Sequence, residues 1–307
     1  MLLALDIGGT NCRVSAWEDA VLRHSLRIPT AGPSLRAALS ELLSGPLKGL
    51  AFRSACIALA GPVQDRVARL TNHPWVVDAD ALQDALGFPV VLANDFAAAA
   101  KGIAELPPAG YERLSGPAPK AGHLAAVLGP GTGLGQALVL PDGSIQATEG
   151  GHVDLAPNDP VEARLWQWMH ERHGHVSAER VLSGPGLRDL QHFMHAVEGL
   201  AGAPLDTPAQ VTQSESPSSQ AAVSRFCRML GAHAGNLALS TLPAGGVWLA
   251  GGIPPRLPLV EGGLLAGFRS KGRLSFALDE IPLMLVRDPD LGLRGAAAFA
   301  REAAPPR

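Results

Sequence analysis

One pattern occurs twice in this chain and constrains its fold more than any other feature. Residues 3–17 (LALDIGGTNCRVSAW) and residues 125–140 (AAVLGPGTGLGQALVL) each consist of an apolar strand, a glycine-rich turn with a threonine, and a second strand. The two segments share the same order of elements, but they are not a tandem repeat of fixed period. We therefore predict two related domains, each built around one strand–turn–strand hairpin.

Short β-type runs alternate with helical stretches along the rest of the chain, which is typical of α/β architecture. Further strands are expected at residues 54–61, 90–94 and 245–253. Helices are expected at residues 95–106, 159–174, 177–200, 224–242 and 292–303. Residues 201–220 are rich in Pro, Ser, Thr and Gln, a composition that favours a surface loop.

A change in composition indicates where one domain gives way to the other. Residues 107–122 are rich in Pro, Gly and Ala, and we place the crossing near their start. The last helical segment is expected to pack back on the first domain. We predict a small domain of residues 1–106 with the C-terminal helix at 289–307, and a large domain of residues 107–288.

Both glycine turns are candidate phosphate sites, because glycines let backbone N–H groups approach a ligand closely. Neither turn is a Walker loop, since the chain has no G-x-x-x-x-G-K-[ST]. GPGTGLG also lacks the dinucleotide spacing and leads into the strand-like QALVL. Facing hairpins, with hydroxyl donors at Thr10 and Thr132, are another way to clamp a triphosphate. Either turn alone is explained equally well as a tight hairpin.

Asp6 directly precedes the first glycine turn. A carboxylate beside a phosphate is repulsive unless a cation lies between them. Mg²⁺ that keeps most of its waters is the natural mediator. Asp6 is therefore the candidate metal residue, and Mg²⁺ is an expected cofactor.

A single carboxylate, Asp95, stands where the apolar strand VVLAN gives way to the alanine-rich DFAAAA. One explanation is that Asp95 caps the following helix. Another is general-base chemistry, because phosphoryl transfer to a hydroxyl needs a base aimed at that hydroxyl. The neighbouring Asn94 offers both a donor and an acceptor. The two roles of Asp95 are compatible.

Composition excludes several other classes of function. A net charge of −3, without a Lys/Arg cluster, gives no reason to expect nucleic acid as a partner. No apolar run approaches the ~20 residues of a membrane helix, and the N-terminus lacks the basic region of a signal peptide. The three cysteines, Cys12, Cys56 and Cys227, lie far apart. This sparse, odd count favours the reducing cytoplasm.

Several segments resemble known families. LALDIGGTN, GPGTGLG and LAGGI resemble the first phosphate loop, the second phosphate loop and the adenosine-side loop of the actin, hexokinase and sugar kinase superfamily. More closely, LANDFAA, EGGHVDLAPND and GHVSAERVLSGPG resemble the bacterial ATP-dependent glucokinase family. The resemblance runs over nearly the whole chain. It implies an α/β fold of two ribonuclease-H-like (actin/hexokinase-type) domains flanking a cleft, and ATP-dependent phosphorylation of glucose at its 6-hydroxyl.

The resemblance also implies roles for residues on the sugar side. Asp95 would be the catalytic base and would bind glucose together with Asn94. Glu149 and His152 of EGGH, and Glu179 of SAERVLSG, would bind sugar hydroxyls. Without the resemblance, these three would be a turn carboxylate, a satisfied buried histidine and a residue near a helix cap. Gly61 and Asn72 are expected to line the sugar, although a strand-end Gly-Pro and an Asx turn also explain them.

On the nucleotide side, the resemblance implies a set of residues from three glycine-rich segments. They are Asp6, Gly8, Gly9, Thr10, Asn11, Gly131, Thr132, Gly133, Gly251 and Gly252. ATP is the expected phosphoryl donor, but the loop glycines do not distinguish it from ADP or polyphosphate. The family also implies a homodimer.

Three alternatives remain at this stage. The chain could phosphorylate another hexose, such as mannose or fructose. It could be a sugar-sensing regulator, but such proteins carry a DNA-binding helix-turn-helix ahead of the first phosphate strand, and here that strand begins at residue 2. It could be a non-catalytic nucleotide switch, which would have no need for Asn94, Asp95 and EGGH together.

Overall fold

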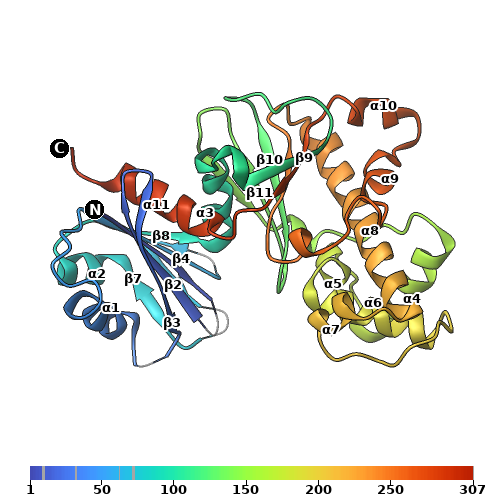
Figure 1. The fold of residues 1–307 in the computed structure, drawn as a ribbon, viewed down its shortest axis with the longest axis horizontal. Helices are drawn as coiled ribbons and strands as arrows, with labels where there is room; N and C mark the ends of the chain where they lie inside the picture. Colours follow the sequence, from blue (N-terminus) through green and yellow to red (C-terminus); the bar gives the residue numbers. More distant parts are fainter. Residues whose placement is uncertain (9–10, 32, 62, 71–72, 307) are drawn as a thin grey trace. The chain divides into compact units, whose positions relative to one another are not determined.

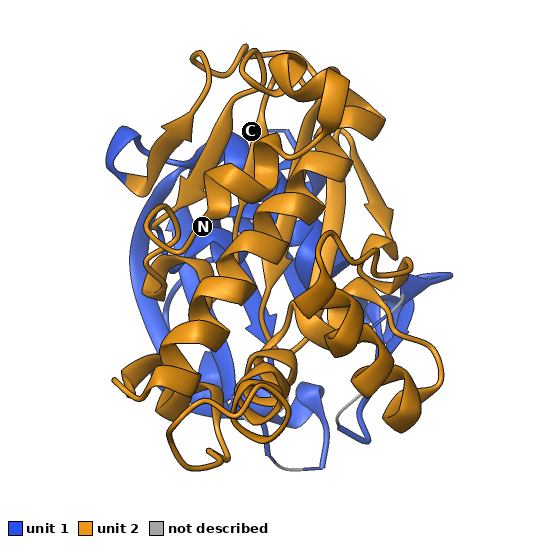
Figure 2. Ribbon diagram, turned by 90° about the vertical axis from the view of Figure 1, so that its right-hand side faces the viewer, with its two compact units in different colours: residues 1–109, 288–307 blue, residues 110–287 orange. Residues whose placement is uncertain are grey.

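The chain folds into two compact units in the computed structural model (Figures 1 and 2). Unit 1 comprises Met1–Ala109 and Asp288–Arg307, and unit 2 comprises Gly110–Arg287. The structure describes residues 1–306 except 9–10, 32, 62 and 71–72. Among the helices of this described part, none is long and apolar enough to cross a membrane.

A mixed sheet with the strand order β3-β2-β1-β4-β8 organises unit 1. Its strands are β1 (Leu2–Ile7), β2 (Asn11–Glu18), β3 (Val21–Pro29), β4 (Ser54–Leu59) and β8 (Val90–Asn94). Antiparallel pairing joins β1 to β2, and parallel pairing joins β1 to β4 and β4 to β8. The continuous apolar run of β4 is buried throughout, as expected for a parallel strand covered on both faces.

Helices cover both faces of this sheet. Leu3 and Leu5 of β1 pack with α1 (Leu35–Ser44) and α2 (Ala79–Leu86), whereas the alternate residues Leu2 and Ala4 pack with α3 (Asp95–Gly102) and α11 (Leu291–Ala303). Figure 1 shows α11, from the end of the chain, beside α3 and β8. Small residues permit this contact: a Cβ added at Gly295 would lie 1.6 Å from the carbonyl oxygen of Ala98.

Short elements complete unit 1. They are β5 (Val63–Gln64), β6 (Val67–Arg69) and β7 (Val76–Asp78), which form a separate small sheet, and the 3-10 helix η1 (Ile103–Glu105). A second 3-10 helix, η2 (Pro108–Gly110), spans the boundary between the two units.

Unit 2 is built on a second mixed sheet, with the strand order β12-β11-β10-β13-β14-β9. Its strands are β9 (Tyr111–Ser115), β10 (Ala125–Pro130), β11 (Leu134–Val139), β12 (Ile145–Thr148), β13 (Val247–Leu249) and β14 (Leu283–Val286). As in unit 1, a glycine turn joins two antiparallel strands, here β10 and β11, and the first of them also has a parallel neighbour, β13. The repeated hairpin seen in the sequence therefore has the same place in both sheets.

The helices of unit 2 surround one long buried helix, α8 (Pro217–Thr241). The others are α4 (Pro160–His173), α5 (Ala178–Val181), α6 (Gly184–Ala196), α7 (Pro208–Gln213), α9 (Leu264–Arg269) and α10 (Ser275–Leu278), with 3-10 helices η3 (Gly150–His152), η4 (Pro254–Arg256) and η5 (Gly272–Leu274). A Cβ at Gly231 of α8 would lie 1.9 Å from the carbonyl oxygen of Leu264, so glycine permits close contact with α9.

The predicted segments 95–106, 159–174, 177–200, 224–242 and 292–303 all contain helices. The expectation of a surface loop at 201–220 is wrong in its second half. A capping box between Thr207 and Gln210 starts α7, whose Val211 is fully buried, and α8 begins at Pro217. Thr207 and Ser216 are the N-caps of α7 and α8, and Ser218 and Ser219 lie within α8.

Candidate active site

Asp95 lies at the junction of β8 and α3, and the structure corrects its expected capping role. Asn94 is the N-cap: its side-chain oxygen accepts hydrogen bonds from the backbone N–H groups of Phe96 (2.9 Å) and Ala97 (3.1 Å). Asp95 is the first residue of the helix, and its carboxylate accepts a further bond from the Phe96 N–H at 2.8 Å. The cap therefore leaves Asp95 available for chemistry.

The surroundings of Asp95 change its acidity. Burial raises the pKa of Asp95 to about 6, the bond from Phe96 opposes that rise, and the negative charge of Asp6 adds to it. A carboxyl group with a pKa near 6 is a stronger base than an ordinary aspartate and is still ionised at neutral pH.

Asn94 also connects the strand ends on the predicted sugar side. Its amide nitrogen donates to the carbonyl oxygen of Gly61 at 3.3 Å, just after β4. Gly61 has φ of 141°, a value that favours glycine. The structure therefore brings together Gly61, Asn94 and Asp95. Asn72, the remaining candidate of this group, lies outside the described residues.

The first glycine turn joins β1 to β2, and its base is held by ion pairs. The Gly8 N–H donates to the Asn11 carbonyl oxygen at 3.0 Å. Arg13 binds Asp6 (Nη2 to Oδ2, 2.8 Å) and Asp290 (Nη1 to Oδ1, 3.1 Å). The candidates Gly9 and Thr10 lie outside the described residues.

Sequence reasoning missed Arg13, although a signal was present. In a hairpin closed between Gly8 and Asn11, Asp6 and Arg13 must lie opposite each other, and the observed register pairs them.

The surroundings of Asp6 also bear on the expected Mg²⁺ site. Among the described residues, no group of three His, Cys, Asp or Glu side chains is placed to hold an ion. Mg²⁺ held at the single carboxylate of Asp6 would keep most of its water ligands, and protein side chains would not enclose it.

Several groups hold the second glycine turn, between β10 and β11. Within it, the Gly131 N–H donates to the Gly133 carbonyl oxygen at 2.8 Å. The Gly184 N–H, at the start of α6, donates to the Gly131 carbonyl oxygen at 2.8 Å. Glu179 accepts a bond from the Leu134 N–H at 2.8 Å, and a Cβ at Gly133 would lie 2.5 Å from Glu179 Oε2. Thr132 is exposed at the tip.

The predicted sugar residues of unit 2 converge beside this turn. His152 Nε2 lies 3.9 Å from Glu149 Oε2, and His152 Nδ1 lies 4.0 Å from Glu179 Oε1. Their side chains are exposed to different extents: 91% for Glu149, 60% for His152 and 32% for Glu179. The carboxylates of Glu149 and Glu179 and the imidazole of His152 therefore form one cluster beside the second glycine turn.

The two glycines of EGGH allow this convergence because they lie directly on β11. A Cβ at Gly151 would lie 2.1 Å from the Leu134 carbonyl oxygen, and one at Gly150 would lie 2.2 Å from the side-chain nitrogen of Gln136. A role for Gln136, which the sequence did not suggest, is to pack under the EGGH turn.

Gly251 and Gly252 follow β13, next to the second turn. Gly251 has φ of 86°, and a Cβ there would lie 2.6 Å from the Pro130 carbonyl oxygen at the end of β10. Gly252 is exposed, with open space around the position of a Cβ. The predicted adenosine-side loop and the second phosphate turn are therefore neighbours in unit 2.

Each of the two α/β units has a glycine turn between two antiparallel strands and a parallel neighbour beside the first of them, the topology expected of the actin/hexokinase type. Comparison with known proteins makes this assignment specific. The sequence model of the family described as Glucokinase matches residues 3–303. The chain is 38% identical to a glucokinase of Zymomonas mobilis, over 97% of this chain and 96% of that protein. The chain belongs to the glucokinase family.

Solved structures agree with this assignment. A glucokinase from an Antarctic psychrotroph is 33% identical, with a TM-score of 0.88 and 98% of both chains covered. A ROK family glucokinase from Streptomyces griseus, crystallised with glucose and AMPPNP, is 20% identical and has a TM-score of 0.67, over 98% of this chain and 99% of that one. At that identity the second likeness shows the fold alone. The fold is the two-domain actin/hexokinase-like α/β fold.

Proposed function

We propose that the protein transfers the γ-phosphoryl group of ATP to the 6-hydroxyl of glucose, giving glucose 6-phosphate and ADP. This is the first step of glucose use in glycolysis. Membership of the glucokinase family supports the reaction. Within the chain, the observation that carries it is Asp95, a partly buried carboxyl group at the junction of β8 and α3, with its pKa raised to about 6.

In this reaction Asp95 accepts the proton of the 6-hydroxyl. The hydroxyl oxygen bonds to the γ-phosphorus while the bond from that phosphorus to the β–γ bridging oxygen breaks, and ADP leaves with the electron pair. Asp95 later returns its proton to solvent. Positioning and charge stabilisation contribute most in such a transfer, so a rigidly held base is appropriate.

The other hydroxyls of glucose are the proposed ligands of Asn94, Glu149, His152 and Glu179. Carboxylates accept hydrogen bonds and the imidazole donates one, so the set can distinguish hydroxyl positions. Gly61 and Asn72 are proposed to line the same sugar. A sugar lacking one hydroxyl leaves a polar group unpaired and is rejected strongly for that reason.

The nucleotide is the proposed ligand of the two glycine turns, with Gly251 and Gly252 near the nucleoside. Bound Mg²⁺ supplies positive charge that offsets the charge on the phosphates. Asp6, oriented by Arg13, would hold the ion through its water ligands.

A cytoplasmic homodimer is part of the proposal. The free cysteines Cys12, Cys56 and Cys227 are all buried, which suits a reducing compartment. Light scattering of the purified protein tests the dimer, because a mass of about one chain in solution would contradict it.

An assay for glucose 6-phosphate formation tests the reaction. Purified protein receives MgATP and, separately, glucose, mannose, fructose or N-acetylglucosamine. Glucose-selective turnover is expected. Preference for another hexose would leave Asp95 as the proposed base but change the proposed substrate. Protein that binds ATP without turnover on any sugar would contradict the proposal.

A further inference from the structure

A threonine outside every recognised motif holds the first glycine turn. The Thr30 hydroxyl donates a hydrogen bond of 2.8 Å to the carbonyl oxygen of Gly8. Thr30 is only 8% exposed, which is unusual for a polar residue at the end of an exposed edge strand.

The position of Thr30 follows from the register of the sheet. Asn11, which closes the turn, pairs with Pro29 at the end of β3. The next residue, Thr30, must therefore pass beside the turn itself. Local threonine motifs bond to backbone groups within about four residues, but this bond spans 22 residues. It is a tertiary contact and not a property of the loop.

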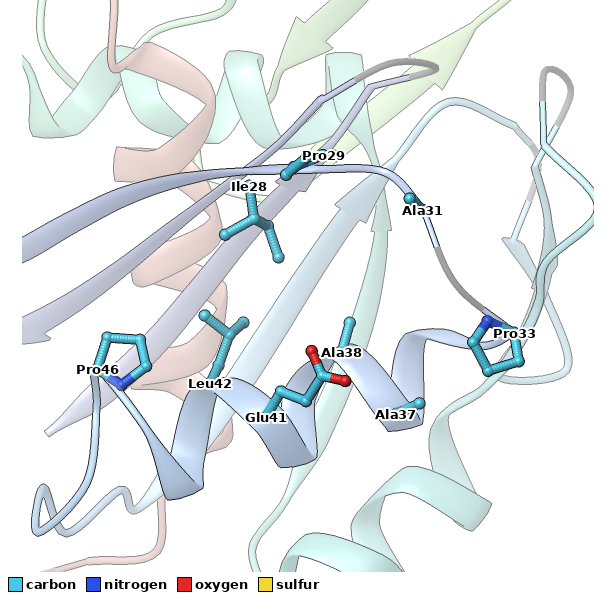
Figure 3. Close-up of a pocket in the computed structure, with 9 residues that line it drawn as sticks. All are labelled: Ile28, Pro29, Ala31, Pro33, Ala37, Ala38, Glu41, Leu42 and Pro46. Atoms are coloured by element: carbon cyan, nitrogen blue, oxygen red, sulfur yellow. The ribbon is translucent and has the colours of Figure 1, made fainter.

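Packing on the other side of the β3–α1 connection is loose. Ala31 and Pro33 of this connection border an apolar groove of about 470 Å³ between β3 and α1 (Figure 3). In the close-up, small side chains such as Ala38 line the α1 side and leave the groove unfilled. The bond to Gly8 therefore matters for holding the connection and the turn together.

The bond constrains the turn through the geometry of the peptide group. A hydrogen bond to a carbonyl oxygen restrains the direction in which that carbonyl group points. The Gly8 N–H is also bound, to Asn11 at 3.0 Å. Both polar groups of Gly8 are thus held, which matters because glycine has little conformational preference of its own.

We infer that Thr30 is a positioning residue for the nucleotide: its hydroxyl holds Gly8, at the start of the first glycine turn, in the orientation that favours binding of the phosphates of ATP. The inference rests on the proposed function and adds to it a residue that neither the motifs nor the family resemblance includes. Thr30 acts through Gly8 and is not itself expected to touch the nucleotide.

Two pairs of variants isolate the hydroxyl. Thr30→Val keeps the shape of the side chain and removes the hydroxyl, whereas Thr30→Ser keeps the hydroxyl. Thr30→Ala and Thr30→Ser differ only in the hydroxyl, and this second pair serves if the valine variant does not fold. Glu41→Gln, on the α1 side of the groove, controls for general disturbance of this region.

Loss of one hydrogen bond that leaves a buried acceptor unpaired is expected to raise KM for MgATP about five- to tenfold in the valine and alanine variants. KM for glucose should change less than about twofold, since Thr30 is hydrogen-bonded to Gly8 and to none of the proposed glucose-binding side chains that the structure describes. Thr30→Ser should stay close to the wild type in both constants. Calorimetric titration with Mg–AMPPNP should show the same loss of affinity and the same rescue by serine.

Three outcomes would overturn the inference. One is an unchanged KM for MgATP in folded Thr30→Val. Another is an equal rise of both KM values, which would indicate a general structural role. The third is an effect of Thr30→Ser as large as that of Thr30→Ala. Failure of the wild type to phosphorylate glucose would instead refute the proposed function, so the two failures are distinguishable.

Discussion

The two glycine turns share a strand–turn–strand plan, yet different groups hold them. In unit 1, Thr30 holds Gly8, and the Asp6–Arg13 ion pair closes the base of the hairpin. In unit 2, Glu179 accepts a hydrogen bond from the Leu134 N–H at the end of the turn, and Glu179 is also a proposed sugar ligand. Among the described residues, the second turn is hydrogen-bonded to a proposed sugar ligand and the first is not, so changes at Glu179 should affect the binding of both substrates.

The chemistry of the two units also differs in burial. Asp95 in unit 1 has its pKa raised by burial before any ligand arrives. Glu149 and His152 in unit 2 are exposed by 91% and 60%. The proposed proton acceptor is therefore partly buried without a ligand, whereas the proposed sugar ligands Glu149 and His152 are exposed.

The largest effect is expected from Asp95→Asn. Removing a general base lowers kcat by about 10²–10⁴-fold, while glucose binding should persist because an amide still accepts and donates hydrogen bonds. Steady-state kinetics measure kcat, and titration with glucose measures its binding. The exposed Asp84→Asn in α2 is a matched control. Near-normal turnover of Asp95→Asn would remove Asp95 as the base.

Stability of the same variant provides an independent check. The folded pKa of Asp95, about 6, lies above the ordinary value of 3.8, so the folded state binds the proton more tightly than the unfolded chain. Stability contributed by this group therefore falls as pH rises through that interval. Asp95→Asn should have a thermal midpoint at pH 7 no lower than the wild type, and a lower midpoint would point to a structural role.

Glu179 offers the sharpest test of the difference between the turns. Glu179→Ala removes the acceptor of the Leu134 N–H together with the sugar ligand, and loss of a charged hydrogen bond should raise KM for glucose about 10- to 100-fold. KM for MgATP should rise as well. Glu179→Gln keeps a side-chain acceptor and should affect mainly glucose, with the exposed Glu215→Gln as the control. An equal rise of KM for MgATP in Glu179→Ala and Glu179→Gln would show that the hydrogen bond from Leu134 to Glu179 does not support the turn.

The pH profile tests the preset base. Because the raised pKa of Asp95 is about 6 and the base must be ionised, kcat/KM for glucose should be near its plateau at pH 7 and fall as pH is lowered. At pH 5 the loss should be about tenfold, since one pH unit below the pKa leaves about a tenth of the groups ionised. A profile that stays flat down to pH 5 would show that Asp95 has an ordinary acidity.

The sequence and the structure agree where a feature is local and differ where it depends on register. Buried strands such as β4, and helices such as α4, follow from apolar runs and periodicity. The sequence could not predict that Asn94, and not Asp95, is the N-cap, because both residue types cap helices well. The N-cap is set by the exact residue at which the helix begins. Edge strand β3 escaped prediction because its residues are mostly exposed.

Site residues divide in the same way. Asp95, Glu149 and His152 lie within motifs, and Asp6–Arg13 was recoverable from the symmetry of the hairpin. The brace formed by Glu179 was not, because 45 residues separate it from Leu134. Thr30 likewise carries no periodic signal. Such contacts depend on how segments distant in the sequence pack together, which local sequence patterns do not encode.

The smallest effect is expected from Arg13→Met, which removes the ion pairs of Arg13 with Asp6 and Asp290. Side chains of Arg13 and Asp6 are 31% and 25% exposed, and pairs of this kind contribute about 1 kcal/mol or less. KM for MgATP should rise about fivefold at most, and the effect should shrink at high salt because ions screen the interaction. Arg27→Met is the matched control, since exposed Arg27 lies opposite Arg13 on β3. A larger rise than that produced by Thr30→Val would mean that the base of the hairpin, and not Gly8, sets the shape of the first turn.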